Sequence, residues 1–319
     1  MRLWGGDRKT LTAGNINVEN NWVRDFSRID RTYTPAVLMD GVGNRIAHNL
    51  FHDAPHHAIR LEGNDHVIEY NDVHSVVYES DDQSGIDMWN NPSYQGNIMR
   101  YNFWHHIGSG HTIAGQSGIR LDDAICNVLM YSNIFLCAAD GHFGAIQIHG
   151  GKDNVADNNL FVACQAAASF STWSDERWQE MFTRADMKKR LYEDIDIDQP
   201  PYSTKYPWLK DLRKHNGQNF FWRNLLVRCN SLALRRNTNI HEFLETISTD
   251  DTNAFLTDGT PESYDKAFSP ESWKPFTACS AMRPIPFAEI GLYDDPSRAS
   301  AVDTAAARQI TPHFKGTRR

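Results

Sequence analysis

The sequence predicts an all-β protein, a right-handed parallel β-helix in which short strands coil around one axis. Two observations lead to this fold class. An Asn closely followed by apolar residues recurs seven times along the 319 residues, and runs with apolar residues at alternate positions accompany most of the copies. Alternation with a period of two is typical of strands, whereas helices repeat every ~3.6 residues. A strand-sized unit that recurs every ~20 to 50 residues indicates a solenoid.

The first repeated unit is a short strand that ends at an Asn. Its copies are Asn21-Trp22, Asn49-Leu50-Phe51, Asn71-Asp72-Val73, Asn102-Phe103-Trp104, Asn133-Ile134-Phe135, Asn159-Leu160-Phe161 and Asn224-Leu225-Leu226. Their spacing varies, which is typical of coils joined by loops of different length. We expect these Asn residues to adopt left-handed backbone at the bends and to hydrogen-bond from coil to coil.

A second strand in each coil follows the same logic. The aligned segments are Val37-Leu38-Met39-Asp40-Gly41, Ile59-Arg60-Leu61-Glu62-Gly63, Ile86-Asp87-Met88-Trp89-Asn90, Ile119-Arg120-Leu121-Asp122-Asp123, Ile146-Gln147-Ile148-His149-Gly150 and Leu232-Ala233-Leu234-Arg235-Arg236. Because strand side chains alternate, the first and third residue of each segment should point inward and the second and fourth outward.

The coils are predicted to occupy residues 1–240, with at least six of them between about Asn15 and Arg236. Residues 1–11 could cap the first coil. Residues 241–319 are expected to form an irregular segment that packs on the coils and ends in a loose tail.

A helical insertion is predicted at 171–215. Trp178, Met181 and Leu191 share one face of a helix over 175–192, and Ser174 can cap its start.

Composition excludes several classes of function. The net charge of −8, with Lys188-Lys189-Arg190 as the one basic run, argues against a nucleic-acid partner. No stretch of ~18 apolar residues is present, so no membrane span is expected, and the N-terminus lacks the pattern of a signal peptide. The cysteines Cys126, Cys137, Cys164, Cys229 and Cys279 occur singly, which favours buried free thiols over a zinc site or disulfides.

The outward positions of the second strand set predict a groove with polar walls. Stacking places Arg60, Asp87, Arg120 and Gln147 in one column, with Asp40, Glu62, Trp89, Asp122, His149 and Arg235 in the column beside it. No hydrophobic core requires these residue types. Neighbouring coils lie ~4.8 Å apart, so the side chains share one surface.

Paired carboxylates on such a surface suit glycoside hydrolysis, which needs one acid and one base or nucleophile. Asp87 and Asp122 are one coil and two residues apart, roughly 8 Å, a spacing typical of inverting enzymes. Asp122-Asp123 is the stronger candidate, and Asp81-Asp82 lies in a loop before its strand. A surface ion-pair ladder of Asp87 with its arginine neighbours is the competing interpretation.

Two other functions remain open from the residues alone. A polysaccharide lyase would need Arg or Ca²⁺ to neutralise a uronate and a base to remove a proton. Arg60, Arg120, His149 and Arg235 could serve, although acidic side chains are more abundant. A glycan-binding ladder without chemistry is the third possibility. A hydrolase requires no cofactor, and the expected partner is a poly- or oligosaccharide.

The histidines His52, His74 and His105 each follow a repeat Asn by three residues and should stack in one column. We interpret them as a polar ladder and predict no metal site, since no carboxylate is regularly interleaved with them.

These segments resemble a known group of proteins. Gly43 to Asn49, Gly63 to Asn71, Glu79-Ser80-Asp81-Asp82, Ile119 to Asp123 and Gly150 to Asn154 look like right-handed parallel β-helix proteins of carbohydrate-degrading bacteria. The chain is most similar to the glycoside hydrolase family 141 type, over about Gly5 to Leu234.

That resemblance implies an α-L-fucosidase-like or xylanase-like hydrolase of plant or algal glycans, secreted or periplasmic. Its catalytic aspartates would fall on Asp81-Asp82 and on Asp122-Asp123. Glu62, Asp87, Trp89, Arg120, His149, Arg60 and Arg235 would then hold the sugar. Asp87 departs from the pattern, because relatives tend to have an uncharged residue there.

Overall fold

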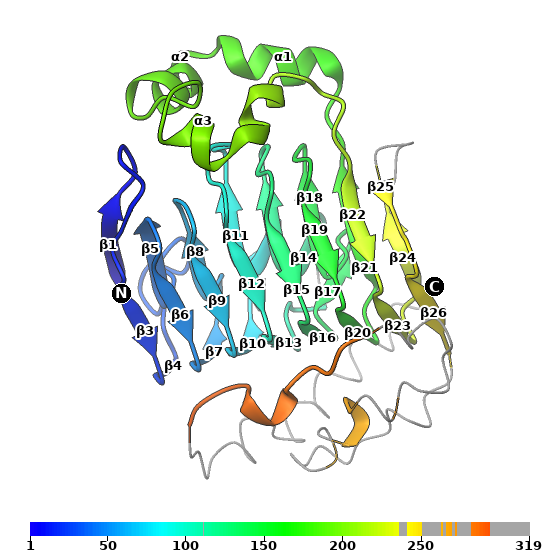
Figure 1. The fold of residues 1–319 in the computed structure, drawn as a ribbon. Coiled ribbons are helices and arrows are strands. Elements are labelled where there is room, and N and C mark those ends of the chain that lie inside the picture. The colour runs from blue at the N-terminus through cyan, green and yellow to red at the C-terminus, as the bar shows by residue number, and fades with distance from the viewer. Residues whose placement is uncertain are drawn as a thin grey trace.

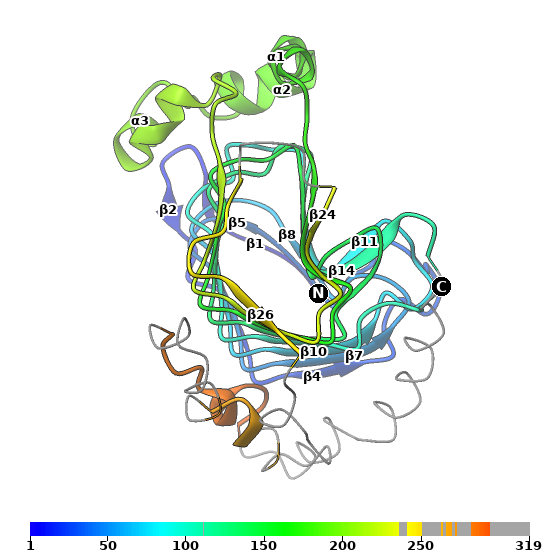
Figure 2. The same ribbon diagram turned by 90° about the vertical axis from the view of Figure 1, so that its right-hand side faces the viewer.

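The computed structural model describes residues 1–110, 112–235, 241–250, 263, 266–269, 272 and 282–293. Their strands form three sheets that wind around one axis as a right-handed parallel β-helix, with a helical insertion above the coils (Figures 1 and 2). The fold class predicted from the sequence is confirmed.

Each coil contributes one strand to each sheet. Sheet 1 contains β1 (Arg2–Asp7), β5 (Val37–Gly41), β8 (Ile59–Leu61), β11 (Gln83–Trp89), β14 (Gly115–Asp122), β18 (Ile146–His149), β21 (Ala166–Ser171) and β24 (Ser231–Leu234). Two short strands, β2 (Thr12–Ala13) and β17 (Ala139–Gly141), join it in antiparallel fashion.

Sheets 2 and 3 are entirely parallel. Sheet 2 contains β3 (Asn17–Glu19), β6 (Arg45–Ala47), β9 (Val67–Glu69), β12 (Ile98–Arg100), β15 (Leu129–Tyr131), β19 (Val155–Asp157), β22 (Asn219–Trp222) and β25 (His241–Glu242). Sheet 3 contains β4 (Trp22–Arg24), β7 (Leu50–Ala54), β10 (Asp72–Val76), β13 (Phe103–His105), β16 (Ile134–Leu136), β20 (Leu160–Val162), β23 (Leu225–Val227) and β26 (Ile247–Thr249).

The coils begin earlier than the sequence indicates. Strand β1 starts at Arg2 and pairs in parallel with β5, so the segment predicted as a possible cap belongs to the first coil. The strand of residues 166–171 was also missed. It contains Ala and Ser where other coils have Val, Ile or Leu, and such residues have a weak preference for strands.

The predicted register of sheet 1 is correct for five of its six segments. Ile59 pairs with Val37 and with Ile86, and Ile119 pairs with Ile86 and with Ile146. The inward residues of these strands, the first and third of each segment, are fully buried or nearly so. They form the core inside the coils.

The sixth segment is shifted by one residue. Ala233, not Leu232, pairs with Ala168, and Ala168 in turn pairs with Ile146. The long insertion and the unrecognised β21 removed the neighbour that would have fixed this register. Arg235 therefore lies beyond the end of β24 and does not share a column with His149.

The repeat Asn residues form a buried ladder along the whole stack. Each Nδ2 donates to the Oδ1 of the next Asn at 2.9 to 3.1 Å. The series runs Asn21, Asn49, Asn71, Asn102, Asn133, Asn159 and Asn224. The ladder side chains also hydrogen-bond to backbone groups. For example, Asn102 Nδ2 donates to the Ile68 carbonyl at 2.9 Å. The predicted ladder is confirmed.

The left-handed backbone lies one residue earlier than predicted. His48, Tyr70 and Tyr101, which precede ladder Asn residues, have φ values of 51°, 55° and 56°. The Asn amide donates to the carbonyl two residues before it, as Asn71 does to Glu69 at 3.0 Å. The residue between them makes the bend, which frees the Asn side chain for the ladder.

The insertion consists of short helices rather than one long helix. It contains α1 (Asp175–Thr183), α2 (Ala185–Lys188), a π-helical turn (Lys189–Glu193), α3 (Tyr202–Lys205) and a 3₁₀ turn (Pro207–Asp211). The predicted cap is present, since the Ser174 hydroxyl accepts from the Arg177 N–H. The single helix predicted over 175–192 is interrupted at Arg184, whose backbone is extended.

The insertion lies over the turns that follow sheet 1 (Figures 1 and 2). Trp178 and Met181 pack with Ala124 and Cys126 of a coil turn. The Tyr206 hydroxyl donates to Asp65 Oδ2 at 2.7 Å. These contacts fix the insertion along one edge of sheet 1.

A short C-terminal segment packs outside sheet 3. Phe287 and Ile290, in and after a 3₁₀ turn (Phe287–Glu289), contact the outward side chains of Phe103, Ile134 and Leu160. Most of the predicted 241–319 segment, including its tail and Cys279, lies outside the described residues. The thiols of Cys126, Cys137, Cys164 and Cys229 are free.

None of the described helices has the length and hydrophobicity needed to cross a membrane.

The ladder leads to a stability prediction. Asn102 is fully buried, and replacing it with Ala leaves amide and carbonyl partners on both sides without hydrogen bonds. We expect Asn102→Ala to lower the free energy of unfolding by about 3 kcal/mol. Chemical denaturation, monitored by circular dichroism, measures this change in the free energy of unfolding. Exposed Asn216→Ala is the control, and equal stability of the two variants would refute a stabilising ladder.

Candidate active site

A pocket of about 480 Å³ opens on the outer side of sheet 1. Its lining side chains are Tyr33, Pro35, Leu38, His57, Arg60, Glu62, Asp81, Asp82, Gln83, Asp87, Trp89, Arg120 and Asp122. Strands β5, β8, β11 and β14 supply most of them, because outward residues of stacked strands meet on one surface. Eight of the eleven residues proposed from the sequence line this pocket.

The loop before β11 forms one wall of the pocket. The Asp81 carboxylate accepts hydrogen bonds from the backbone N–H groups of Ile113, Ala114 and Gly115 at 2.9 to 3.0 Å, and from the Thr112 hydroxyl. Burial acts to raise the pKa of Asp81, but the four hydrogen bonds outweigh it and lower that pKa far below its ordinary value. Asp81 therefore joins the loops that precede β11 and β14.

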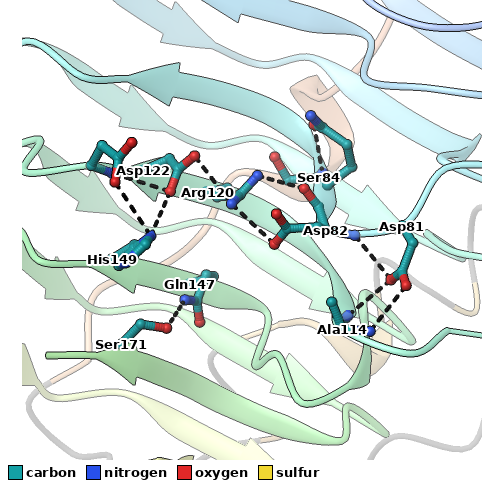
Figure 3. A network of polar contacts seen from close by, with 12 residues as sticks. Asp81, Asp82, Ser84, Ala114, Arg120, Asp122, Gln147, His149 and Ser171 are labelled. Atoms are coloured by element: carbon teal, nitrogen blue, oxygen red, sulfur yellow. Dashed lines mark hydrogen bonds and ion pairs between the residues drawn. The ribbon is translucent and has the colours of Figure 1, made fainter.

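Arg120 is the centre of the charged network (Figure 3). Its Nη2 lies 3.0 Å from Asp82 Oδ1 and 3.1 Å from Asp122 Oδ2. Its Nη1 also donates to the backbone carbonyl of Asp82. The two carboxylates thus share one guanidinium nitrogen.

Asp122 is held in its ionised form. Burial acts to raise the pKa of Asp122, but the hydrogen bond from His149 and the charge of Arg120 outweigh it and lower the pKa. His149 Nδ1 lies 2.9 Å from Asp122 Oδ1, and since a carboxylate only accepts, that nitrogen carries the proton.

The pKa of Asp82 is displaced in the opposite direction. Partial burial in the pocket wall and the nearby Asp122 raise the pKa of Asp82, against the attraction of Arg120. Its side chain is 58% exposed and can reach a bound molecule. Two carboxylates on one guanidinium group therefore have pKa values displaced in opposite directions.

Asp87 belongs to the same pocket lining as Asp82 and Asp122, and it is buried. Burial raises the pKa of Asp87 to about 6, although Arg60 and Arg120 oppose the rise. One oxygen bonds to Arg60, while Oδ1 has no hydrogen-bond partner in the described structure. The predicted proximity of Asp87 to both arginines is present, because Asp87 pairs in register with each.

Asp123 and Trp89 connect the pocket to the insertion. Trp89 Nε1 donates to Asp123 Oδ2 at 2.9 Å, and Arg177 of α1 approaches Asp123 Oδ1 at 3.5 Å. Trp89 is 42% exposed, and the guanidinium groups of Arg60 and Arg190 lie 5.6 and 5.9 Å from its ring centroid. Asp123 thus orients Trp89 and lies outside the pocket lining.

The remaining predicted residues surround this network. Arg60 Nε donates to Glu62 Oε1 at 3.1 Å. Arg235 reaches Gln147 Oε1 at 3.3 Å, and its guanidinium lies 5.2 Å from the Phe143 ring. Arg235 is therefore near the site despite the shifted register.

Sequence reasoning missed several lining residues. Tyr33 and Pro35 come from the loop before β5, where no repeat motif marks them, whereas Leu38 holds an outward position of the aligned segment 37–41 but is apolar. His57 contacts Gln83 at 3.2 Å between Nδ1 and Oε1. Burial lowers the pKa of His57 well below its ordinary value. The sequence offers a signal for Gln83, because a Gln stands at the start of two neighbouring aligned strands. The structure pairs Gln83 with Gln116 at the extended starts of β11 and β14.

Two groups of side chains have spacings that suit a metal ion. Asp122, Asp123 and His149 form one group beside the pocket, but Arg120 and Arg177 already neutralise its carboxylates. The second group, on sheet 3, contains Asp72, His74 and His105.

The predicted histidine column is present in sheet 3. His52 stacks on His74 with ring centroids 4.8 Å apart, and His74 stacks on His105 at 4.5 Å. The sequence predicts no regularly interleaved carboxylate, but the structure places one carboxylate beside the column. Asp72 Oδ1 lies 2.9 Å from His105 Nε2, because Asp72 is on the same strand as His74 and points the same way.

Comparisons with known proteins agree with the fold. The family model described as "Right handed beta helix region" matches residues 35–177. No curated protein matches the chain. Neither the family model nor the two structures described next points to glycoside hydrolase family 141.

Two solved structures are similar at low identity. One is a mannuronic acid specific polysaccharide family 6 lyase from human gut microbiota, with 12% identity, a TM-score of 0.36, and coverage of 98% of this chain and 69% of that chain. The other is a mutant of the periplasmic alginate epimerase AlgG, with 12% identity, a TM-score of 0.34, and coverage of 78% and 62%.

The buried Asp87 predicts a pH effect on stability. Its native pKa of about 6 lies above the ordinary 3.8, so the folded state binds the proton more tightly than the unfolded state does. This contribution to the free energy of unfolding should be largest below pH ~4 and be lost as the pH rises through about 6. Asp81 and Asp122, with lowered pKa values, act in the opposite direction and at lower pH.

Denaturation of the parent chain and of Asp87→Asn at several pH values measures this effect. We expect the difference in unfolding free energy between the two chains to change between pH 4 and 6 and to be constant above pH 7. A difference that does not vary with pH would show that Asp87 titrates normally.

Proposed function

We propose that the protein is a glycoside hydrolase that cleaves a plant or algal glycan in the pocket on sheet 1. One observation carries the proposal. Asp82 and Asp122 contact the same nitrogen of Arg120, and their pKa values are displaced in opposite directions. A pair of carboxyl groups with separated pKa values is the arrangement that divides the roles of acid and base.

Asp82 is assigned as the general acid. Its raised pKa keeps more of the protonated form, and its exposed side chain can give that proton to the glycosidic oxygen. Asp122 is assigned as the carboxylate that attacks the sugar or activates water. Its lowered pKa keeps it ionised, and His149 fixes its orientation.

Other residues support this pair. Arg120 positions both carboxylates, and Asp87 fixes Arg60 in the pocket lining. Trp89 offers an exposed indole edge for a sugar, oriented by Asp123. Asp81 is assigned to loop structure, since its carboxylate is occupied by four hydrogen bonds.

The charge of the pocket favours a neutral glycan. Five carboxylates and two guanidinium groups line it, and a polyanion would be repelled by the excess of acid. Fucose- or xylose-containing glycans, which the sequence resemblance implies, satisfy this condition.

A polysaccharide lyase is the second candidate. The feature that favours it is the convergence of Arg60, Arg120 and nearby Arg235, which could neutralise a uronate. The paired carboxylates beside Arg60 and Arg120 weaken that case. Ultraviolet absorbance from an unsaturated product formed on alginate or pectin would establish the lyase in place of the hydrolase.

The role assignment predicts the effect of replacing Asp122. Asp122→Asn and Asp82→Asn should each lower kcat by about 10²-fold or more, because a general acid or base contributes ~10²- to 10⁴-fold. Asp123→Asn should have a smaller effect, since Asp123 acts through Trp89. Release of reducing sugars from a panel of plant and algal glycans measures turnover.

The control is Asp186→Asn, an exposed acid of the insertion. Calorimetry should show that Asp122→Asn still binds the oligosaccharide, since the residue acts mainly in the transition state. Unchanged turnover in both site variants would remove the assignment. Tight binding without product by the parent chain would instead indicate a glycan-binding protein.

The spacing of the carboxylates predicts the stereochemistry. Asp82 Oδ1 and Asp122 Oδ2 lie 3.0 and 3.1 Å from Arg120 Nη2, so these two oxygens are at most about 6 Å apart. Retaining enzymes have ~5 to 5.5 Å between the carboxyl groups and inverting enzymes ~6.5 to 9.5 Å. We therefore expect retention, rather than the inversion that the sequence spacing predicts. Proton NMR of the first-formed anomer tests it, and the opposite anomer would refute the assigned pair.

A further inference from the structure

The second histidine and aspartate group lies on sheet 3, whereas the proposed reaction is assigned to sheet 1. Asp72 and His74 project from β10 and His105 from the adjacent β13, on the outer side of sheet 3. Figure 2 shows β7 and β10 on a different side of the coil from β11 and β14. A role in the pocket therefore does not account for this group.

We propose that Asp72, His74 and His105 bind a zinc ion, or another divalent ion of similar ligand preference. Their ligand atoms all lie within 4.8 Å of one another. Two imidazoles and one carboxylate are a common ligand set for Zn²⁺, which binds N and O donors at ~2.0 to 2.2 Å.

His74 supplies the observation that points to a missing partner. The residue is 7% exposed, and its Nε2 has no hydrogen-bond partner in the described structure. Its Nδ1 lies 3.1 Å from the Ser75 hydroxyl. When Nδ1–H donates to Ser75, the lone pair of Nε2 remains available to a metal ion. An unpaired buried nitrogen is otherwise costly.

His105 has the corresponding arrangement. Its Nε2 faces Asp72 Oδ1 at 2.9 Å, and its Nδ1 lies 2.8 Å from His106 Nδ1. Ligation through Nε2 requires the proton to be on Nδ1, where His106 Nδ1 can accept it. Partners of this kind, which fix the tautomer of a ligating histidine, commonly accompany metal sites.

The burial of the group also suits a bound ion, since His74 and His105 are only 7% and 3% exposed. The carboxylate of Asp72 would supply the negative charge.

His52 marks the limit of the site. Its Nε2 accepts from Trp22 Nε1 at 2.6 Å, and its Nδ1 donates to Asp53 Oδ2 at 2.8 Å. Both of its ring nitrogens are occupied, so it supports the stack as a neighbour of His74. The three ligands come from adjacent strands of neighbouring coils, so a bound ion would join two coils and keep a fourth position for water or another group.

Calorimetric titration of the chelator-treated full chain with Zn²⁺ tests the proposal. We expect one ion per chain and at least tenfold weaker binding in His74→Gln and in His105→Gln. His106→Gln should also weaken binding by about 10-fold or more, because loss of a tautomer-fixing partner costs 10- to 100-fold. Co²⁺ in place of Zn²⁺ should give the visible bands of a low-symmetry site in the parent chain, and these bands should be absent from His74→Gln and His105→Gln.

His149→Gln is the matched control, since it removes the histidine of the other group and should bind Zn²⁺ as the parent does. Circular dichroism confirms that each variant is folded. The proposal is overturned if the folded parent chain binds no Zn²⁺, if His74→Gln binds it as tightly as the parent, or if His149→Gln is the variant that loses it.

Discussion

The parallel stacking of coils in register is the constraint on which the rest of the structure depends. The buried Asn ladder enforces it, because each amide donates to the carbonyl oxygen of the next Asn and also satisfies backbone groups of its own bend. A shift of one coil by one residue would exchange its inward and outward side chains and break every hydrogen bond of the ladder. The interior is therefore repetitive, while the outward columns are free to vary.

This freedom explains how one scaffold carries two unlike outer surfaces. On sheet 1 the outward column changes at each coil, so Arg60, Asp87 and Arg120 become direct neighbours and set each other's charge state. On sheet 3 the column repeats one residue type, and the rings of His52, His74 and His105 stack on one another. Variation places side chains of different charge in one pocket, whereas repetition places rings of one type in a stack.

The sequence predicted the parts of the fold that obey the repeat and missed those that depend on tertiary partners. Alternating apolar residues were sufficient to align five strands of sheet 1, and Asn spacing was sufficient for the ladder. The strand at 166–171 was missed because Ala and Ser resemble a loop, and the register of Leu232 then slipped by one. Most of the pocket lining followed from the strand alignment. Tyr33 and Pro35 did not, because they belong to a loop whose fold no periodic pattern specifies.

Tertiary contacts also distinguish acidic residues that are adjacent in the sequence and that the sequence alone could not distinguish. Asp81 and Asp82 are adjacent, yet one anchors the 112–115 backbone and the other faces the pocket. Asp122 and Asp123 are also adjacent, yet Asp122 ends a strand beside Arg120 while Asp123, with a φ of 47°, turns toward Trp89. In each pair the second residue, Asp82 or Asp123, has left-handed backbone. The contacts at these two bends thus give the four carboxylates different partners, and residue identity alone contains no information about that difference.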